Sequence, residues 1–346
     1  MRNLITDVDG VRVGHAHDLT LVSGVTTILF EQPAVASVAV PGGAPGGRDL
    51  GCLEPDAIVA GVDAIVLSGG SGFGLDAASG AQAWLRENGR GFQVGSVRVP
   101  IVPSAICFDL LNGGDKGWDR FPPYRDLGHA ATATAAAAEG GAFALGSVGA
   151  GCGASTVNLK GGLGSASART GAGHTVGAIV VVNALGSAVV GDGPQFWAAP
   201  LEQAGEFGAL GWPGAFDLDA QALTWKGRVP GAATQPATTI ACVATDAHLD
   251  KAQAKRLAIA ATAGLARGLR IAYAAMDGDT VFAAATGIRP LGSGPHELIE
   301  IGAVAADCLA RAIARAVYEA RVPAPCWTGP PAWQDRWPNA KTRWTS

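Results

Sequence analysis

Short apolar runs rich in β-branched residues alternate with Gly- and Pro-containing breaks over the first 240 residues. Runs of this kind, bounded by turn residues, are typical of β-strands. The clearest are residues 25–30, 36–41, 64–69 and 176–182. We predict a strand for each of them, and a return strand at 186–190 beside the last one.

Two segments in this part of the chain change to a helical spacing. After the Gly-rich turn GGSGFG, residues from about 75 to 88 place Ala77, Ala81 and Trp84 along one face, which predicts an amphipathic helix. An Ala-rich run at 130–139 ends at a pair of Gly residues, where helices commonly terminate. We therefore expect helices at both places.

The hydrophobic periodicity disappears between residues 191 and 236, a segment rich in Gly, Pro, Ala and Gln. Structureless connections of this length are uncommon in compact domains unless they have a function of their own. A segment that is to be cleaved, with structureless chain on both sides of the cleavage site, has such a function.

The pattern becomes regular again in the last third of the chain. The elements expected there are a strand at 238–245, a helix at 251–268, a strand at 279–286 and a helix at 297–322. Asp246 or Asp250 would cap the first of these helices. Two strands with two long helices do not make a doubly wound sheet alone, so we expect them to complete a sheet begun by the N-terminal part.

The tail from Pro323 onward holds four of the nine Trp residues and five Pro, with little periodicity. A disordered tail would be unusually aromatic. We expect it to lie as a strap over the surface or to form an oligomer contact.

The composition is that of a globular chain with a sizeable core, because 48% of the 346 residues are hydrophobic and 16% are charged. At roughly 100–200 residues per domain, this length gives one large domain or two small ones. The 50 Gly are about twice the usual share of roughly 7%, which implies many tight turns.

The net charge and the number and spacing of the cysteines limit the classes of protein to which this chain can belong. The net charge of −4 gives no indication of nucleic acid or a membrane surface as a partner. The six Cys are scattered without a CxxC pair, as expected for free thiols in a reducing compartment. No N-terminal segment looks like a signal peptide, and no apolar run reaches the ~18 residues of a membrane span. We expect a soluble cytoplasmic protein.

Thr238 is the most informative candidate for chemistry, although by itself it more simply begins a strand. It follows directly on the Gly- and Pro-rich connection. If the preceding peptide bond were cut, the new α-amine, with a pKa of about 7.7–8.0, would be a base beside the threonine hydroxyl. Nucleophile and base would then belong to one residue.

Other polar residues stand at places where an apolar pattern is interrupted. Asp277 and Asp279 flank a Gly before a strand, and could orient an amine or form a simple turn. Lys160 precedes a GG turn, either as a solvated residue or as a cation near an oxyanion. Asn183 ends a buried run, either as a turn-former or as a positioned hydrogen-bond donor.

Several other kinds of site are excluded. The segment GGSGFG matches neither of the two common phosphate-binding patterns. The six His show no metal-ligand spacing beyond His15 and His17, and no GxSxG elbow is present. We therefore expect no cofactor and no metal ion.

Taken in order, Lys160, Asn183, the residues ATTI at 237–240 and MDGDTVFA at 276–283 resemble the P1 peptidase family, also called S58. This family includes the L-aminopeptidase/D-esterases, the β-aminopeptidases and the endo-type nylon-oligomer hydrolases. The resemblance extends from residue 5 to about 320. Further matching segments are VDGVRVGHA near the start, PGGAPGGRDL at 41–50, LSGGSGFGLDAASG at 67–80, VPIVPSAICFDL at 99–110 and GAGCGAST at 149–156.

The resemblance implies an α+β fold, a four-layer αββα sandwich of the N-terminal-nucleophile-like, ornithine acetyltransferase-like type. It also implies a precursor that cleaves itself between Ala237 and Thr238. The products would be an α chain, 1–237, ending in the long connection, and a β chain, 238–346, that completes the sandwich. The two fragments would stay associated, and several αβ units would form a homo-oligomer.

The same resemblance assigns roles to five residues. Thr238 matches the nucleophile. Lys160 and Asn183 match residues near the scissile bond, with Asn183 as an oxyanion donor. Asp277 and Asp279 match the acidic pair near the new amine.

Two positions depart from the nylon-oligomer branch of this family. That branch has Asn before the nucleophile, where this chain has Ala237. The related ornithine acetyltransferases cut an Ala-Thr bond, so cleavage is still expected. The branch also has a Tyr where this chain has Phe108, which removes a hydroxyl and puts a nylon-oligomer substrate in doubt.

Three functions follow from this comparison. The first is a self-processed aminopeptidase or amidase that acts on short peptides or small amides. The second is an acyltransferase that uses the same Thr238 to pass an acyl group to an amine. The third is a non-catalytic relative, against which the joint presence of all five site residues argues.

Overall fold

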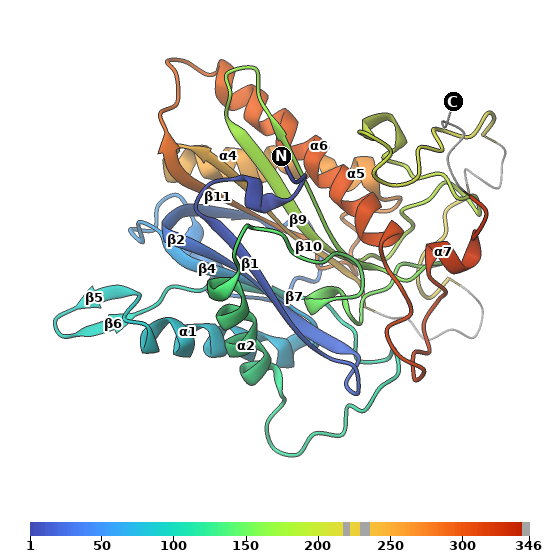
Figure 1. Ribbon diagram of the computed structural model, residues 1–346, viewed down its shortest axis with the longest axis horizontal. Helices are drawn as coiled ribbons and strands as arrows, with labels where there is room; N and C mark the ends of the chain where they lie inside the picture. The colour runs from blue at the N-terminus through green and yellow to red at the C-terminus, as the bar shows by residue number, and fades with distance from the viewer. Residues whose placement is uncertain (217–221, 229–235, 341–346) are drawn as a thin grey trace.

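The computed structural model describes residues 1–216, 222–228 and 236–340. Two sheets are stacked between two layers of helices, as Figure 1 shows. The strands run in the order β3-β7-β4-β2-β11-β10-β9-β8, with β1 paired to β2 off this path. Their bounds are β1 Val11–Asp18, β2 Ser23–Ala39, β3 Gly47–Arg48, β4 Val62–Ser68, β7 Ser104–Ile106, β8 Gly162–Arg169, β9 Thr175–Asn183, β10 Thr238–Ala247 and β11 Thr280–Arg289.

Helices cover the outer face of each sheet. The first sheet contains β1, β3, β4, β7 and the first half of β2, and it is covered by α1 Ala77–Glu87 and α2 Tyr124–Ala137. The second sheet contains β8–β11 and the second half of β2, and it is covered by α4 Lys251–Ala261, α5 Ala263–Gly268 and α6 His296–Tyr318. The shorter elements are α7 Trp333–Arg336 in the tail, the separate hairpin β5 Phe92–Val94 and β6 Val97–Val99, and the 3-10 turns Ile5–Asp7, Leu50–Leu53, Ser71–Asp76, Gly149–Gly151 and Ala199–Leu201. Among the described residues, no helix combines the length and the apolar character needed to cross a membrane.

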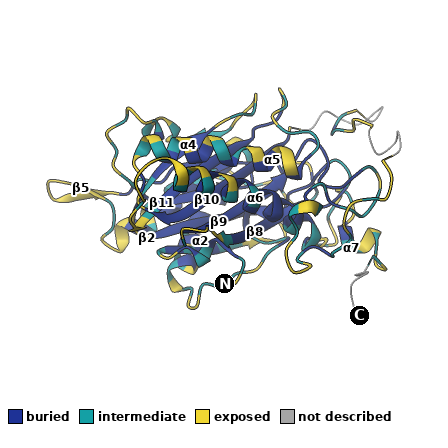
Figure 2. Ribbon diagram, turned by 90° about the horizontal axis from the view of Figure 1, so that it is seen from above, coloured by how far each residue is buried: buried dark blue, intermediate teal, exposed yellow. Residues whose placement is uncertain are grey.

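Three apolar layers hold the sandwich together, and alternate residues of one strand belong to different layers. On β9, Ile179 and Val181 pack between the two sheets, whereas Val180 and Val182 pack against the helices of the second sheet. Because both faces of β9 and β10 are covered, these strands are apolar at nearly every position. Figure 2 shows them as buried strands at the centre of the molecule. The expected αββα sandwich is confirmed.

The last third of the chain completes the sheet as the sequence predicted. Strands β10 and β11 are parallel neighbours, joined by α4 and α5, and β11 then pairs with β2 from the N-terminal part. Asp250, not Asp246, caps α4 by accepting a hydrogen bond from the backbone N–H of Gln253. The predicted helix at 251–268 is in fact two helices, because α4 ends at Ala261 and α5 begins at Ala263.

The two strands predicted at 25–30 and 36–41 are one strand. The first half of β2 pairs with β1 and β4 and its second half with β11, with a shift in register between Leu29 and Ala34. The exposed residues between these positions resemble a turn in the sequence. They stay extended instead, because β2 passes from the first sheet to the second at this point.

The return strand predicted at 186–190 was wrong. Strand β9 pairs with β10 on one side and with β8 on the other, and β8 is a Gly- and Ser-rich segment without a strand-like sequence. Its Gly164 has a packing reason, because a Cβ there would lie 1.9 Å from the carbonyl oxygen of Ala312 on α6. The helix predicted at 130–139 also begins earlier, at Tyr124.

The tail lies against the body of the protein in the part that the structure describes. Trp333 is buried and stacks on Phe196, with ring centroids 5.8 Å apart. This contact supports the prediction of a strap. Trp344 and parts of the 191–236 connection lie outside the described residues.

Candidate active site

Thr238 is the first residue of β10 and is paired in register with Asn183, the last residue of β9. Its side chain is buried, and Oγ1 donates a hydrogen bond to the carbonyl oxygen of Ala237 at 2.5 Å. The hydroxyl therefore lies directly beside the peptide bond at which the resemblance implies cleavage. That carbonyl oxygen also accepts the backbone N–H of Gly278 at 2.9 Å.

The loop before β11 is held against this bond by the parallel pairing of the two strands. Ala237 and Asp277 form a parallel bridge, which places Gly278 over Thr238. A Cβ on Gly278 would lie 2.7 Å from Thr238 Oγ1, closer than side-chain carbons approach. A residue without a side chain is therefore needed for this approach.

The two aspartates of the MDGDT segment are buried near Thr238 and differ in their contacts. Asp279 accepts the backbone N–H of Thr239 and that of Tyr273, each at 2.9 Å. Neither carboxylate oxygen of Asp277 has a hydrogen-bond partner among the described residues. Burial, and then the charge of Asp279, raises the pKa of Asp277 to about 8, and burial also raises the pKa of Asp279. The pair is suited to hold a proton or to receive an ammonium group.

Asn183 is held in one orientation by contacts at both ends of its amide. Its Oδ1 accepts the backbone N–H of Ser155 at 2.9 Å, and its Nδ2 donates to the carbonyl oxygen of Phe108 at 2.8 Å. An amide nitrogen carries two donors. Among the described residues Nδ2 makes one hydrogen bond, so its second N–H is available to a reacting oxygen.

Lys160 is fully buried, but its ammonium group is engaged away from Thr238. Nζ donates to the carbonyl oxygens of Gly151, Ala154 and Gly161 at 2.8–3.0 Å, and lies 4.9 Å from the ring centroid of Trp327. Burial lowers the pKa of Lys160 to about 7. Lys160 therefore organises the 151–161 loop that carries Ser155, and makes no hydrogen bond to the peptide bond between Ala237 and Thr238.

A second buried lysine, Lys226, was missed by the sequence reasoning. Its Nζ donates to Ser155 O at 2.8 Å and lies 3.3 Å from Asn183 Oδ1. Burial lowers the pKa of Lys226 to about 8, and the charge of Asp277 opposes this shift. Lys226 stands alone in an aperiodic segment, so no local pattern could have found it.

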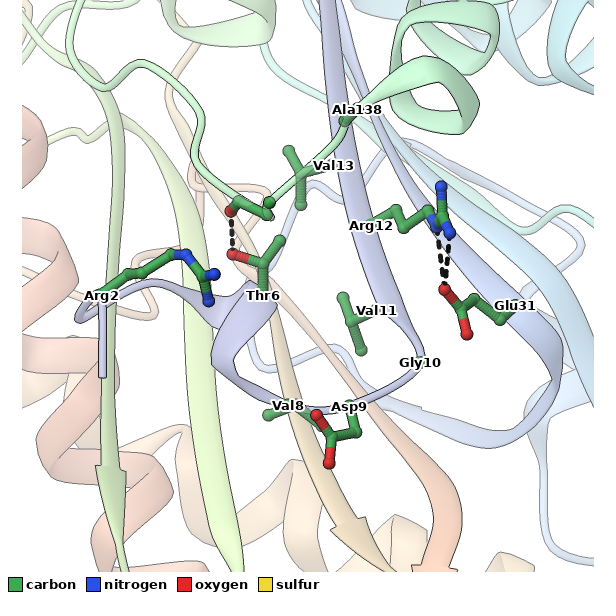
Figure 3. A pocket seen from close by; sticks show the side chains of 12 residues that line it. Arg2, Thr6, Val8, Asp9, Gly10, Val11, Arg12, Val13, Glu31 and Ala138 are labelled. Atoms are coloured by element: carbon green, nitrogen blue, oxygen red, sulfur yellow. Dashed lines mark hydrogen bonds and ion pairs between the residues drawn. The ribbon is translucent and has the colours of Figure 1, made fainter.

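Two cavities lie apart from these residues. One of about 770 Å³ is lined by Trp197 and Trp225 together with Asn158 and Ser187. A smaller one of about 220 Å³, drawn in Figure 3, is lined by the N-terminal segment, β1 and the loop after α2, and contains the Arg12–Glu31 ion pair. Neither cavity has a candidate site residue in its lining. Among the described residues, no cluster of three or more His, Cys, Asp or Glu could hold a metal ion.

The site can therefore support nucleophilic attack on an amide. A buried hydroxyl lies beside a carbonyl, a backbone N–H donates to the oxygen of that carbonyl, and two carboxylates and two lysines are buried nearby. Donors directed at a carbonyl oxygen stabilise the negative charge that develops there when the carbonyl carbon is attacked.

Comparison with known proteins agrees with this geometry. The chain is 43% identical over 357 residues to an uncharacterized aminopeptidase of Mycobacterium tuberculosis, covering 98% of this chain and 99% of that protein. It is 28% identical to a 6-aminohexanoate-oligomer endohydrolase of Paenarthrobacter ureafaciens, over 81% of this chain and 74% of that protein.

Among solved structures, an L-aminopeptidase D-Ala-esterase/amidase from Ochrobactrum anthropi, described as a variant of the Ntn hydrolase fold, has a similar architecture. The TM-score is 0.64 with 20% identity, over 92% of this chain and 87% of that one. The model of peptidase family S58 matches residues 3–324. This chain belongs to peptidase family S58 and is a hydrolase of peptide or amide bonds.

Proposed function

We propose that this protein is a self-processing N-terminal-threonine hydrolase, in which Thr238 first cuts its own chain and then acts on short peptides or small amides. The observation that carries the proposal is the placement of Thr238 Oγ1, 2.5 Å from the carbonyl oxygen of Ala237, with the N–H of Gly278 on the same oxygen. A hydroxyl and an oxyanion donor on one peptide bond favour attack on that bond.

In the proposed self-cleavage, Thr238 Oγ bonds to the carbonyl carbon of Ala237, and the hydroxyl proton passes to the nitrogen that leaves. The peptide bond becomes an ester. Water then hydrolyses the ester, so that Ala237 ends the α chain with a carboxylate and Thr238 begins the β chain with a hydroxyl and a free amine. The Gly278 N–H and the second N–H of Asn183 are the donors proposed for the oxyanion.

In the mature enzyme, the new α-amine takes the proton as Thr238 Oγ attacks the substrate, and then gives it to the leaving amine. Water releases the acyl group. Asp277 and Asp279, buried beside Thr238, would orient the new ammonium group and set its pKa.

The substrate class rests on the relatives, one an aminopeptidase and the other a 6-aminohexanoate-oligomer endohydrolase. We propose short peptides or small amides with a free amino end.

Intact mass and Edman sequencing of the purified protein test the first step together. A second N-terminus reading TTIACV is expected, and Thr238→Ala should abolish both this cut and hydrolysis of dipeptide and p-nitroanilide substrates. An active preparation that stays a single species of 34.7 kDa would overturn self-cleavage as the activating event. Activity that depends on an added amine acceptor would instead favour acyl transfer.

A further inference from the structure

Lys226 belongs to the connection that ends at the proposed scissile bond, yet its side chain contacts Ser155 and Asn183, which lie much earlier in the chain. Its backbone N–H donates to Leu185 O at 3.0 Å, just after β9. From there the ammonium group donates to Ser155 O at 2.8 Å and lies 3.4 Å from Asn183 O. The residue is buried, with 9% of its surface exposed. A lysine is rarely buried unless its charge is matched.

The contact with Asn183 determines which way the amide points. Nζ and the backbone N–H of Ser155 both donate to Oδ1, which leaves Nδ2 as the end that faces acceptors. Asn183 is the register partner of Thr238. The lysine therefore orients the donor that is proposed to stabilise the oxyanion.

The other buried lysine of the site, Lys160, does not make this contact. Its ammonium group is surrounded by three carbonyl oxygens of its own loop.

We propose that Lys226 is a positioning residue for self-cleavage, holding Asn183 toward Thr238. The inference rests on the proposed function of Thr238.

The test follows the appearance of the two fragments by intact mass in freshly purified protein. Lys226→Ala is expected to slow cleavage at least about tenfold, the kinetic equivalent of one charge-assisted hydrogen bond. Lys226→Arg, which keeps the charge and the donors, is expected to stay within about threefold of wild type. Ethylammonium, which carries three N–H donors, is expected to restore cleavage to Lys226→Ala, whereas tetramethylammonium, which carries none, is not.

Lys251→Ala is the matched control, because Lys251 also donates to two backbone carbonyls, those of Cys52 and Ala57, but outside the site. It should cleave at the wild-type rate. Wild-type cleavage by Lys226→Ala overturns the inference while leaving the proposed function intact. Slow cleavage that neither Lys226→Arg nor ethylammonium restores also overturns it, because the defect is then structural. A wild-type chain that never cleaves overturns the proposed function and the inference with it.

Discussion

At the scale of single residues, Gly278 lies against both Ala237 and Thr238. The backbone N–H of Gly278 contacts the carbonyl oxygen of Ala237, and its missing side chain leaves room for the threonine hydroxyl. Gly278 therefore donates to the carbonyl oxygen of this peptide bond and also leaves space for the hydroxyl beside it.

Gly278→Ala should slow self-cleavage at least about tenfold, because the added Cβ would lie 2.7 Å from Thr238 Oγ1 and displace the hydroxyl or the loop. The rate is measured from the accumulation of the two fragments. Gly51→Ala is the control, since a Cβ there meets nothing within 4 Å. Equal rates for the two variants would show that the hydroxyl does not depend on this approach.

At the scale of elements, a buried aromatic residue helps to attach the tail to the body of the protein. Trp333 on α7 stacks on Phe196, and its indole N–H donates to Pro194 O at 3.0 Å. These contacts tie the last part of the chain to the connection that precedes the cleavage site.

Trp333→Ala should lower the free energy of unfolding by about 3–5 kcal/mol, the usual cost of removing a large buried aromatic side chain. Urea unfolding in the uncut Thr238→Ala background measures it. Trp212→Ala, at a Trp that is 49% exposed, should change stability far less. If Trp333→Ala and Trp212→Ala lowered the free energy of unfolding by similar amounts, α7 would contribute little to the stability of the fold.

The helix cap at the start of α4 gives a second prediction at this scale. Asp250 and Gln253 hydrogen-bond each other's backbone N–H groups. Asp250→Ala should cost about 1 kcal/mol of unfolding free energy, as the loss of an N-cap usually does. Urea unfolding in the Thr238→Ala background measures this cost, and fragment accumulation in the otherwise wild-type chain should stay unchanged. A large loss of cleavage would indicate that α4 helps to place Thr238 through more than stability.

At the scale of the whole molecule, the proposed cut falls between two chains that share one sheet. Strand β10 lies between β9 on one side and β11 on the other, so the fragment 238–346 contributes two central strands. We expect both fragments to elute together in size-exclusion chromatography after cleavage. Separation without denaturant would contradict this, because buried central strands cannot be left exposed.

Stability should also depend on pH through Asp277. Burial raises the pKa of Asp277 to about 8 in the folded chain, from the value of 3.8 that is usual for an aspartate. The folded state then binds the proton more tightly than the unfolded state, so the free energy of unfolding should fall as pH rises from about 5 to 8. In the Thr238→Ala background, Asp277→Asn should flatten this slope in urea titrations. Asp126→Asn, at an exposed carboxylate on α2, should leave the slope unchanged.

Local pattern was enough for the elements whose residues are apolar on a regular spacing. Strands β4, β9, β10 and β11 and helices α1 and α6 lie close to their predicted places. The pairing of Asn183 with Thr238, and the nearness of Asp277 and Asp279, agree with the roles that the resemblance assigns to them. Those roles stay predictions until cleavage is measured.

Strand β8 and the continuity of β2 could not be read from the sequence. The strand character of β8 comes from packing so close to α6 that only small residues fit, and such residues have low strand propensity. The middle of β2 is exposed and contains Pro33, so it looks like a turn until the second sheet is in place.

The sequence by itself determined most of the strands and helices, because hydrophobic periodicity is a local property, and the order of its motifs pointed to Thr238 as the proposed nucleophile. Only the tertiary structure decided which groups each buried lysine contacts. Lys160 donates to the carbonyls of its own loop, whereas Lys226 contacts Asn183, 43 residues earlier in the chain. The burial of a charge depends on partners far away in the chain, and these meet only in the folded protein.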